Sequence, residues 1–398
     1  MKRLIKTTAI VSGAVMLSVL SAVGYYGRAL PDTYNICRGE HLSVHSMLPI
    51  TAVSTESTAA EAFGNAEGSG STLMLFGAVP VKDVKTRSTE RAYAAPGGVP
   101  IGLRVISDGV IVVDIQEVEG RSPAKEAGIR TGDVIYKVNG EAVSDNADVA
   151  EQISGSFGKP CEVQLERDGK KLTLEIEPEL SEGSYKAGLW VRDSSAGIGT
   201  LTFYERSTGA FAGLGHAVCD CDTRQEIGLS SGTVGEIRLT GITRSESGSP
   251  GQLIGEFKNS ASIGEIRENC SEGVYGTLNS DPVKNHAELP VAFPHEVREG
   301  AAVMLTSVDG SGAEEYRVEI EEVDLSDSAE HDMLIHVTDK RLIERAGGIV
   351  QGMSGSPLIQ NGRIVGAVTH VLVDDSTRGY AIFADKMYSH LSDIDPEG

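Results

Sequence analysis

A glycine-rich segment near the C-terminus contains the serine best suited to act as a nucleophile. Ser354 lies between Met353 and Gly355, and Gly352 comes two residues before it. Such a serine needs an outward-facing Oγ, backbone N–H groups that converge on the developing oxyanion, and open space for the acyl group. Gly352 can adopt the positive φ that directs its N–H towards the same point as the N–H of Ser354, and Gly355 leaves room for substrate. The segment predicts a nucleophile at Ser354 and an oxyanion hole at Gly352 and Ser354. Taken alone, it also fits a glycine-rich turn with an incidental serine.

A histidine surrounded by small residues is the candidate general base. His216 lies in the sequence Ala-Gly-Leu-Gly-His-Ala-Val at residues 212–218, where small neighbours would let an imidazole turn inward from a cleft. An imidazole within reach of a serine hydroxyl can accept its proton. His370, on the predicted strand after Ser354, is a rival base that we rank below His216. The Ser-Gly-Ser-Pro sequence at residues 247–250 repeats that at 354–357 without the glycine lead-in, and we interpret it as a polar loop.

The spacing of the cysteines suggests one candidate metal site. His216, Cys219, Cys221 and Cys270 could together supply a Cys3His zinc site. Structural zinc sites usually bring their ligands in two closely spaced pairs, whereas Cys270 is isolated in the sequence. The chain has five cysteines, an odd number spread over 398 residues, which is not a disulfide framework. We therefore expect no metal and no cofactor at the catalytic site.

Charge and the N-terminal residues indicate the compartment. The chain carries 35 basic and 57 acidic residues, a net charge of −22, which argues against nucleic acid as a partner. Lys2, Arg3 and Lys6 precede an uncharged stretch from Thr7 to Tyr26 that is long enough to cross a membrane. By the positive-inside rule, the residues after it lie outside the cytoplasm. We expect residues 1–28 to be a signal or membrane anchor and favour an uncleaved anchor; removal by signal peptidase stays open.

The middle of the chain resembles a PDZ domain. Residues 122–140 read SPAKEAGIRTGDVIYKVNG, between two apolar strands at 101–105 and 110–115 and a later helix and hairpin. This order of elements is similar to the PDZ domains attached to bacterial extracytoplasmic proteases. The resemblance implies a groove in which a peptide adds as a strand beside Gly98, Ile101, Gly102 and Leu103.

The remaining sequence predicts a mainly β protein. Forty-seven glycines and 5% aromatic residues indicate many tight turns, and residues 181–398 contain frequent short strands typical of a barrel or sandwich. Convincing helices are expected at 338–346 and 385–392. We divide the chain into the anchor, an N-terminal β-containing region with a flexible linker (29–93), the PDZ domain (94–180) and a peptidase domain (181–398). The linker is the Ser-, Gly- and Ala-rich stretch 54–71, which favours cleavage.

Two motifs together resemble one peptidase family. GLGHAVCD at residues 213–220 and GGIVQGMSGSPLIQNGRIVGAVTHV at residues 347–371 are similar to the stage IV sporulation protein B (SpoIVB) peptidases of endospore formers. The resemblance implies a chymotrypsin-like serine endopeptidase with His216 as base, Ser354 as nucleophile and Asp339 as the acid that orients the imidazole. Asp339 lies only 354 − 339 = 15 residues before the serine and could instead cap the helix that begins at Lys340. Met353 replaces the Asp of the usual GDSGG motif, so activation by an ion pair to a new N-terminus is excluded.

The same resemblance implies a biological role. Members of that family are signalling proteases, secreted between the forespore and mother-cell membranes, that trigger processing of a late mother-cell sigma factor. It implies a membrane-bound protein substrate and, with the exposed linker, self-cleavage in trans by other copies. The alternatives are a catalytically inactive PDZ scaffold and a zinc-stabilised interaction protein at the membrane surface. Cleavage-site preference and oligomeric state are open.

Overall fold

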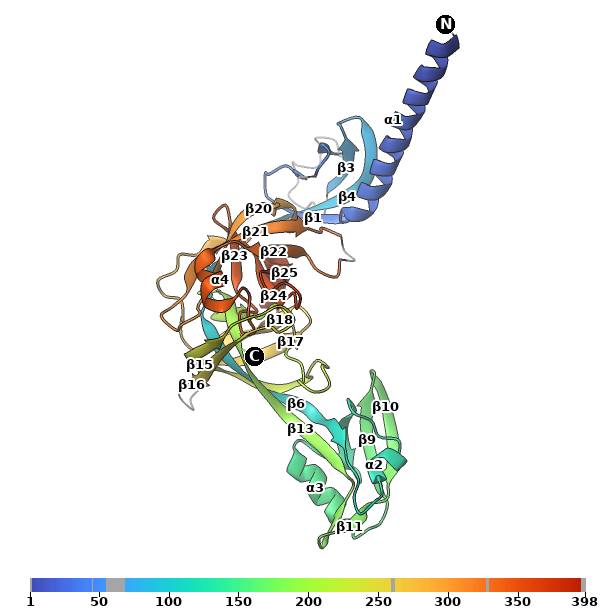
Figure 1. The fold of residues 1–398 in the computed structure, drawn as a ribbon, viewed down its shortest axis with the longest axis vertical. Helices are drawn as coiled ribbons and strands as arrows, with labels where there is room; N and C mark the ends of the chain where they lie inside the picture. Colours follow the sequence, from blue (N-terminus) through green and yellow to red (C-terminus); the bar gives the residue numbers. More distant parts are fainter. Residues whose placement is uncertain (1, 45, 55–68, 259–261, 327–328, 395–398) are drawn as a thin grey trace.

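The computed structural model describes residues 2–44, 46–54, 69–258, 262–326 and 329–394. The molecule is elongated, with a long N-terminal helix at one end and the PDZ region at the other (Figure 1). A small sheet adjoins the helix, and two β-barrels occupy the middle. The expected mainly β fold, with an apolar N-terminal helix, a PDZ region and a β-barrel region, is confirmed.

The N-terminal region combines the apolar helix with a four-stranded sheet. Helix α1 spans Lys2–Ala29, and its segment Ile10–Ala29 is long and apolar enough to cross a membrane. Tyr26 and Leu30 are buried against the sheet, which has the order β1-β4-β3-β2. Its strands are β1 (Thr33–Cys37), β2 (Ile50–Ser54), β3 (Ser69–Leu75) and β4 (Val79–Thr89). Most of the expected linker, residues 55–68, lies outside the described residues.

The first barrel is built on two long strands, β6 (Pro100–Ile115) and β13 (Leu189–Tyr204). Within the described residues, six strands close the ring in the order β6-β15-β17-β18-β14-β13, because β13 pairs back with β6. The other members are β14 (Ala210–Gly213), β15 (Leu229–Thr243), β17 (Gly264–Cys270) and β18 (Gly273–Leu278). Strands β5 (Tyr93–Pro96), β16 (Gln252–Phe257) and β19 (Leu289–Pro290) pair at its margins.

The PDZ domain is an extension of the same two strands. The outer halves of β6 and β13 leave the barrel, and β6 there pairs with β7. The predicted turn, strands and helices are present, except that residues 101–105 and 110–115 form one strand. The remaining elements are α2 (Pro123–Glu126), β7 (Val134–Val138), β8 (Glu141–Ala142), α3 (Asn146–Ser154), β9 (Cys161–Arg167), β10 (Lys170–Ile176), β11 (Glu179–Ser181) and β12 (Ser184–Lys186).

The expected position of the peptide groove is wrong. Ile101 and Leu103 are only 1% and 2% exposed, in the core of the first barrel. Both edges of this part of β6 are already paired, one with β13 and the other with β15, so no edge is open to a peptide. A Cβ on Gly102 would overlap the Phe257 ring, and one on Gly98 would lie 2.8 Å from the Leu305 side chain of the second barrel. The glycines therefore serve barrel packing.

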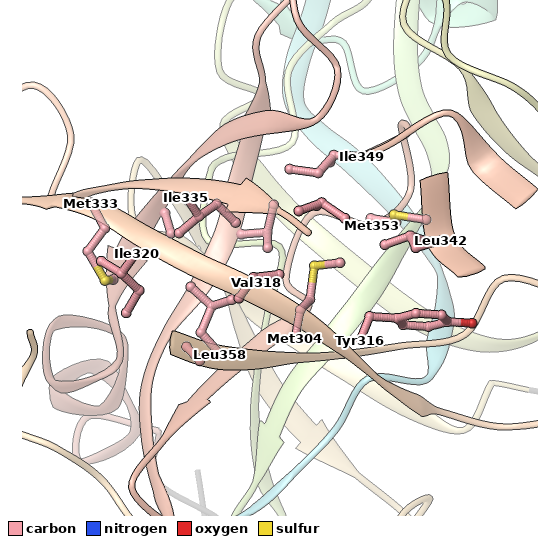
Figure 2. Close-up of a cluster of buried hydrophobic side chains, with 14 of the residues drawn as sticks. Met304, Tyr316, Val318, Ile320, Met333, Ile335, Leu342, Ile349, Met353 and Leu358 are labelled. Atoms are coloured by element: carbon pink, nitrogen blue, oxygen red, sulfur yellow. The ribbon is translucent and has the colours of Figure 1, made fainter. Parts of the chain in front are cut away.

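The second barrel is closed and has its own core. Its order is β20-β21-β22-β25-β24-β23, and apolar side chains from its strands point towards one another inside it (Figure 2). The strands are β20 (Gly300–Thr306), β21 (Glu314–Val323), β22 (Met333–Val337), β23 (Pro357–Gln360), β24 (Arg363–Val371) and β25 (Arg378–Phe383). The 3-10 helix η2 (Pro294–Glu296) precedes it. The predicted helices α4 (Lys340–Ala346) and α5 (Ala384–Leu391) are confirmed.

Candidate active site

The serine loop is anchored in the core of the second barrel. Met353 is fully buried and packs near Leu342 and Ile349 (Figure 2), whereas the next residue, Ser354, is only half-buried. Gly352 has the predicted positive φ, +97°. Within the described residues, no acceptor is bonded to the backbone N–H of Gly352 or of Ser354. The loop therefore presents a hydroxyl and two unbonded N–H groups, as an oxyanion hole requires.

Gly355 has a different function from the one expected from the sequence. A Cβ at this position would overlap the carbonyl oxygen of Thr200 and lie 2.5 Å from the backbone nitrogen of Leu214. The glycine thus leaves room for the backbone of the first barrel rather than for substrate. Its φ of +94° also favours glycine.

Thr200, on β13, connects the two barrels and was missed by sequence reasoning. Its Oγ1 donates a hydrogen bond to the Gly352 carbonyl at 2.7 Å, and its N–H donates to the Ser354 carbonyl at 2.9 Å. Its own carbonyl accepts a bond from the N–H of Leu214, two residues before His216. This one buried residue is therefore bonded to both the serine loop and the loop that carries His216. A threonine within a β-strand carries no sequence signal that would have predicted this role.

The histidine loop is built from two successive residues in the left-handed region. Leu214 has φ +65° and Gly215 φ +72°. The following ring is fixed by a hydrogen bond of 2.8 Å between His216 Nδ1 and the carbonyl oxygen of Ala217. Because a carbonyl only accepts, Nδ1 carries the proton and Nε2 is left as the acceptor. Burial lowers the pKa of His216, which keeps this ring neutral.

Ser354 and His216 contact two adjacent residues of β24, Thr369 and His370. Ser354 Oγ donates a hydrogen bond of 2.7 Å to the carbonyl of Thr369. The ring of His370, the next residue, lies 4.8 Å from the ring of His216, centroid to centroid. Burial, together with the neighbouring rings of His216 and His331, lowers the pKa of His370 to about 4. The two sequence-predicted residues thus each contact the same end of β24, and the rival base His370 lies beside His216.

Asp339 is the N-cap of α4. Its Oδ1 accepts bonds from the backbone N–H and the Nε of Arg341, and its Oδ2 accepts from Arg341 Nη2 and the backbone N–H of Arg317. The Arg341 guanidinium holds the pKa of this buried carboxyl down to about 2. The alternative role as a helix cap is confirmed, and the role as catalytic acid stays a prediction.

The repeated Ser-Gly-Ser-Pro sequence lies outside this cluster. Ser247 is exposed, and its Oγ donates to the carbonyl of Asp374. Glu246 and Ser249 form the bridge of a turn there, and Gly248 N–H donates to the Val373 carbonyl. The arrangement is that of a surface turn without a neighbouring imidazole contact in the described part of the chain.

The chain is similar to known proteins over its PDZ and peptidase regions. A family model described as SpoIVB peptidase S55 matches residues 183–388, and a PDZ domain model matches residues 97–177. A putative zinc metalloprotease of Lactococcus lactis subsp. lactis (strain IL1403) is 34% identical over 121 residues, which is 30% of this chain and 25% of that protein. A probable periplasmic serine endoprotease DegP-like of Rhizobium meliloti (strain 1021) is 39% identical over 72 residues, 18% of this chain and 14% of that protein. The chain therefore spans a quarter or less of these relatives.

Two solved structures are similar over parts of the chain. The active form of the Rv3671c protease from M. tuberculosis has a TM-score of 0.29 and 18% identity, covering 50% of this chain and 74% of that one. The PDZ domain of an SdrC-like protein from Listeria monocytogenes has a TM-score of 0.19 and 20% identity, covering 22% and 90%. The peptidase match at residues 183–388 extends over more than half of the 398 residues and contains both His216 and Ser354. The chain belongs to the SpoIVB peptidase S55 family of serine peptidases and carries a PDZ domain.

Proposed function

We propose that this chain is a membrane-anchored, extracytoplasmic serine endopeptidase that uses Ser354 as nucleophile and His216 as general base. Nε2 of His216 would take the Oγ proton as Ser354 attacks the peptide carbonyl, and would then protonate the leaving amine. The N–H groups of Gly352 and Ser354 would bind the oxyanion, and water would hydrolyse the acyl-enzyme. Asp339 is proposed as the carboxylate that assists His216.

The observation that carries this proposal is the contact of both residues with one end of β24. Ser354 Oγ is bonded to the Thr369 carbonyl, and the His216 ring packs beside His370. The neutral imidazole already has its Nδ1 proton engaged by Ala217, which leaves Nε2 as the basic atom. Rotation of the Ser354 hydroxyl about its Cα–Cβ bond is the movement that would redirect its proton.

One observation favours the alternative of an inactive PDZ scaffold. The Ser354 hydroxyl donates to the Thr369 carbonyl, not to an imidazole. An activated serine reacts covalently with a fluorophosphonate, whereas an unactivated one does not. Labelling of the full chain, with mass mapping of the modified peptide, therefore separates a peptidase from a scaffold.

Substitution of the two residues tests the assignment. We expect Ser354→Ala and His216→Ala each to abolish labelling and lower peptide hydrolysis by about 10⁶-fold, because such residues act as a unit. Ser247→Ala is the matched control, since it alters the same tetrapeptide sequence on an exposed turn. Loss of activity in Ser247→Ala, or near-normal turnover in either other variant, would refute the assignment.

The proposed location rests on the N-terminal helix. Its apolar stretch Ile10–Ala29 follows the basic residues Lys2, Arg3 and Lys6, so the positive-inside rule favours an external peptidase. By family resemblance, the compartment would be the space between forespore and mother-cell membranes. The substrate would be a membrane-bound regulator whose cleavage starts processing of a late mother-cell sigma factor. Co-expression with candidate membrane regulators, scored for cleavage dependent on Ser354, tests this role.

Self-cleavage is proposed for the Ser/Gly/Ala-rich stretch at residues 54–71. Cleavage there would cut the covalent link between α1 and the barrels and PDZ domain, while β1 and β2 stay paired with β4 and β3. Active enzyme mixed with a tagged Ser354→Ala chain should shorten the tagged chain to fragments that begin within that stretch. An intact tagged chain after full turnover of a peptide substrate would contradict cleavage in trans.

A further inference from the structure

A cluster of metal-binding side chains lies away from the active site, where the β17–β18 hairpin contacts helix α5. The donor atoms of Glu268, Cys270 and His390 all lie within 4.8 Å of one another. His390 Nδ1 is 3.0 and 3.1 Å from the two carboxylate oxygens of Glu268, and its Nε2 is 2.7 Å from Glu272 Oε2. The His390 ring stacks on Tyr275 at 4.5 Å, with 12° between the ring planes.

We propose that Glu268, Cys270 and His390 form a binding site for a divalent transition-metal ion, with zinc as the best fit. A thiolate, an imidazole and a carboxylate are all ordinary zinc ligands, and three protein ligands leave a fourth tetrahedral position for water. Metal-ligating histidines usually donate their other N–H to a carboxylate. In the structure both ring nitrogens of His390 face carboxylates, so Nδ1–H donates to Glu268 and Nε2–H donates to Glu272. On binding, Nδ1 would release its proton to solvent and ligate the ion, while Nε2–H stays on Glu272.

A second cluster in the chain shows why the first one is the better site. The donor atoms of Asp220, Cys221 and Asp222 also lie within 4.8 Å of one another. There, however, the Arg192 guanidinium already supplies the cation, with Nη1 2.6 Å from Asp220 and 2.9 Å from Cys221 Sγ. Its Nη2 is 2.7 Å from Asp222. Within the described residues, Glu268 and Glu272 pair with His390, whereas the nearby Arg267 pairs with Glu265. An imidazolium, unlike a guanidinium, can give up a proton and become a metal ligand.

The location gives the proposed ion a structural consequence. Glu268, Cys270 and Glu272 belong to the first barrel, whereas His390 lies on α5, which follows β25 of the second barrel. Met387 and Leu391 of α5 pack in one cluster with Phe203 and Ala212 of the first barrel. A bound ion would therefore fasten together the two barrels that carry His216 and Ser354. All three ligands are only half-buried, so an ion can enter from solvent.

Cobalt binding tests the site without using activity. The full-length Ser354→Ala chain, kept reduced and freed of metal with a chelator, would be titrated with Co²⁺ and followed by absorption. We expect a thiolate-to-cobalt charge-transfer band that saturates at one ion per chain and is displaced by Zn²⁺. Zinc should also raise the melting temperature of the chain, since a ligand that binds only the folded state stabilises it.

Three variants decide the assignment. Cys270→Ser should remove the cobalt band, and Glu272→Gln should weaken zinc binding by about 10- to 100-fold while keeping the thiolate band. Cys221→Ser is the matched control, because it removes a thiol from the cluster filled by Arg192, and its titration should equal that of the parent chain. Absence of the band in the parent chain, its persistence in Cys270→Ser, or its loss in Cys221→Ser would each overturn the proposal.

Discussion

The serine loop and the histidine loop meet at the same place but are held by different means. The serine loop is fixed within its own barrel, where Met353 fills the core directly before Ser354. The histidine loop depends on its surroundings: Leu214 and Gly215 turn the chain, Ala217 holds Nδ1, and His370 of the other barrel packs on the ring. The proposed nucleophile is thus positioned by local sequence, and the proposed base by contacts across the two barrels.

For the proposed mechanism, this difference makes the orientation of His216 the point to test. A backbone carbonyl sets the tautomer of the imidazole but carries no full charge to stabilise an imidazolium. A carboxylate supplies both effects. The structure shows the carbonyl of Ala217 on Nδ1 and the carboxylate of Asp339 engaged by Arg341.

The largest effect that can separate these two modes is expected from Asp339→Asn. Asparagine caps helices about as well as aspartate, so the substitution removes the charge and keeps the cap. If Asp339 stabilises the imidazolium, kcat should fall by about 10⁴-fold, as in other Ser-His-Asp sites. The melting temperature should fall as well, because the amide nitrogen of asparagine cannot accept the bonds that Oδ2 receives from Arg341 Nη2 and the Arg317 N–H. Steady-state peptide hydrolysis and thermal unfolding measure the two quantities.

Arg341→Ala is the control for that variant, because it removes the main partner of the carboxylate and retains the acid. It should lower stability but preserve turnover. Full activity in Asp339→Asn would show that Asp339 is a helix cap alone and that Ala217 suffices to orient His216.

Much of the fold was predictable because its signals are local. The turn-helix-turn at residues 122–140, the helices at 340–346 and 384–391 and strands β20, β21, β23 and β24 of the second barrel follow from capping, glycine and alternating apolar residues. The turn before Ser354 was predictable for the same reason, since glycine readily adopts the positive φ that Gly352 has. Local patterns could therefore locate the PDZ domain and the positive φ before the proposed nucleophile.

Other features were beyond such patterns because they depend on distant strands. Residues 100–115 form one strand shared by a barrel and the PDZ domain, and its alternation is the same whether the neighbour is β15 or a bound peptide. Thr200 gains its role from contacts with Gly352 and Ser354, more than 150 residues later in the chain. Cys270 and His390 meet only because α5 packs on the first barrel.

A smaller effect is expected when the link between the two loops is cut. Thr200→Val keeps the shape of the side chain and the backbone N–H bond to Ser354 but removes the Oγ1 bond to the Gly352 carbonyl. A hydrogen bond of this kind contributes about 1 kcal/mol, so we expect kcat and the fluorophosphonate labelling rate to fall by about fivefold. Thr200→Ser retains the hydroxyl and should stay near the parent rate. Greater damage in Thr200→Ser than in Thr200→Val would assign the effect to methyl packing instead of to the hydrogen bond.

The smallest expected effect is on the pH profile, and it separates His216 from its rival. Burial lowers the pKa of His216, so its neutral, basic form should persist below the ordinary value of 6.5, and kcat/KM should fall only at more acidic pH.

His370 affects stability instead, because its pKa is about 4 in the folded chain against 6.5 in the unfolded chain. Its neutral form therefore favours folding above pH 6.5, and that contribution is lost as the pH falls from 6.5 towards 4. His370→Gln should leave the acidic limb of kcat/KM in place. Its free energy of unfolding should also fall less than that of the parent chain when the pH is lowered from above 6.5 to 5. Disappearance of that limb in His370→Gln would identify His370 as the general base, because a residue that only neighbours the base cannot remove the base's own titration.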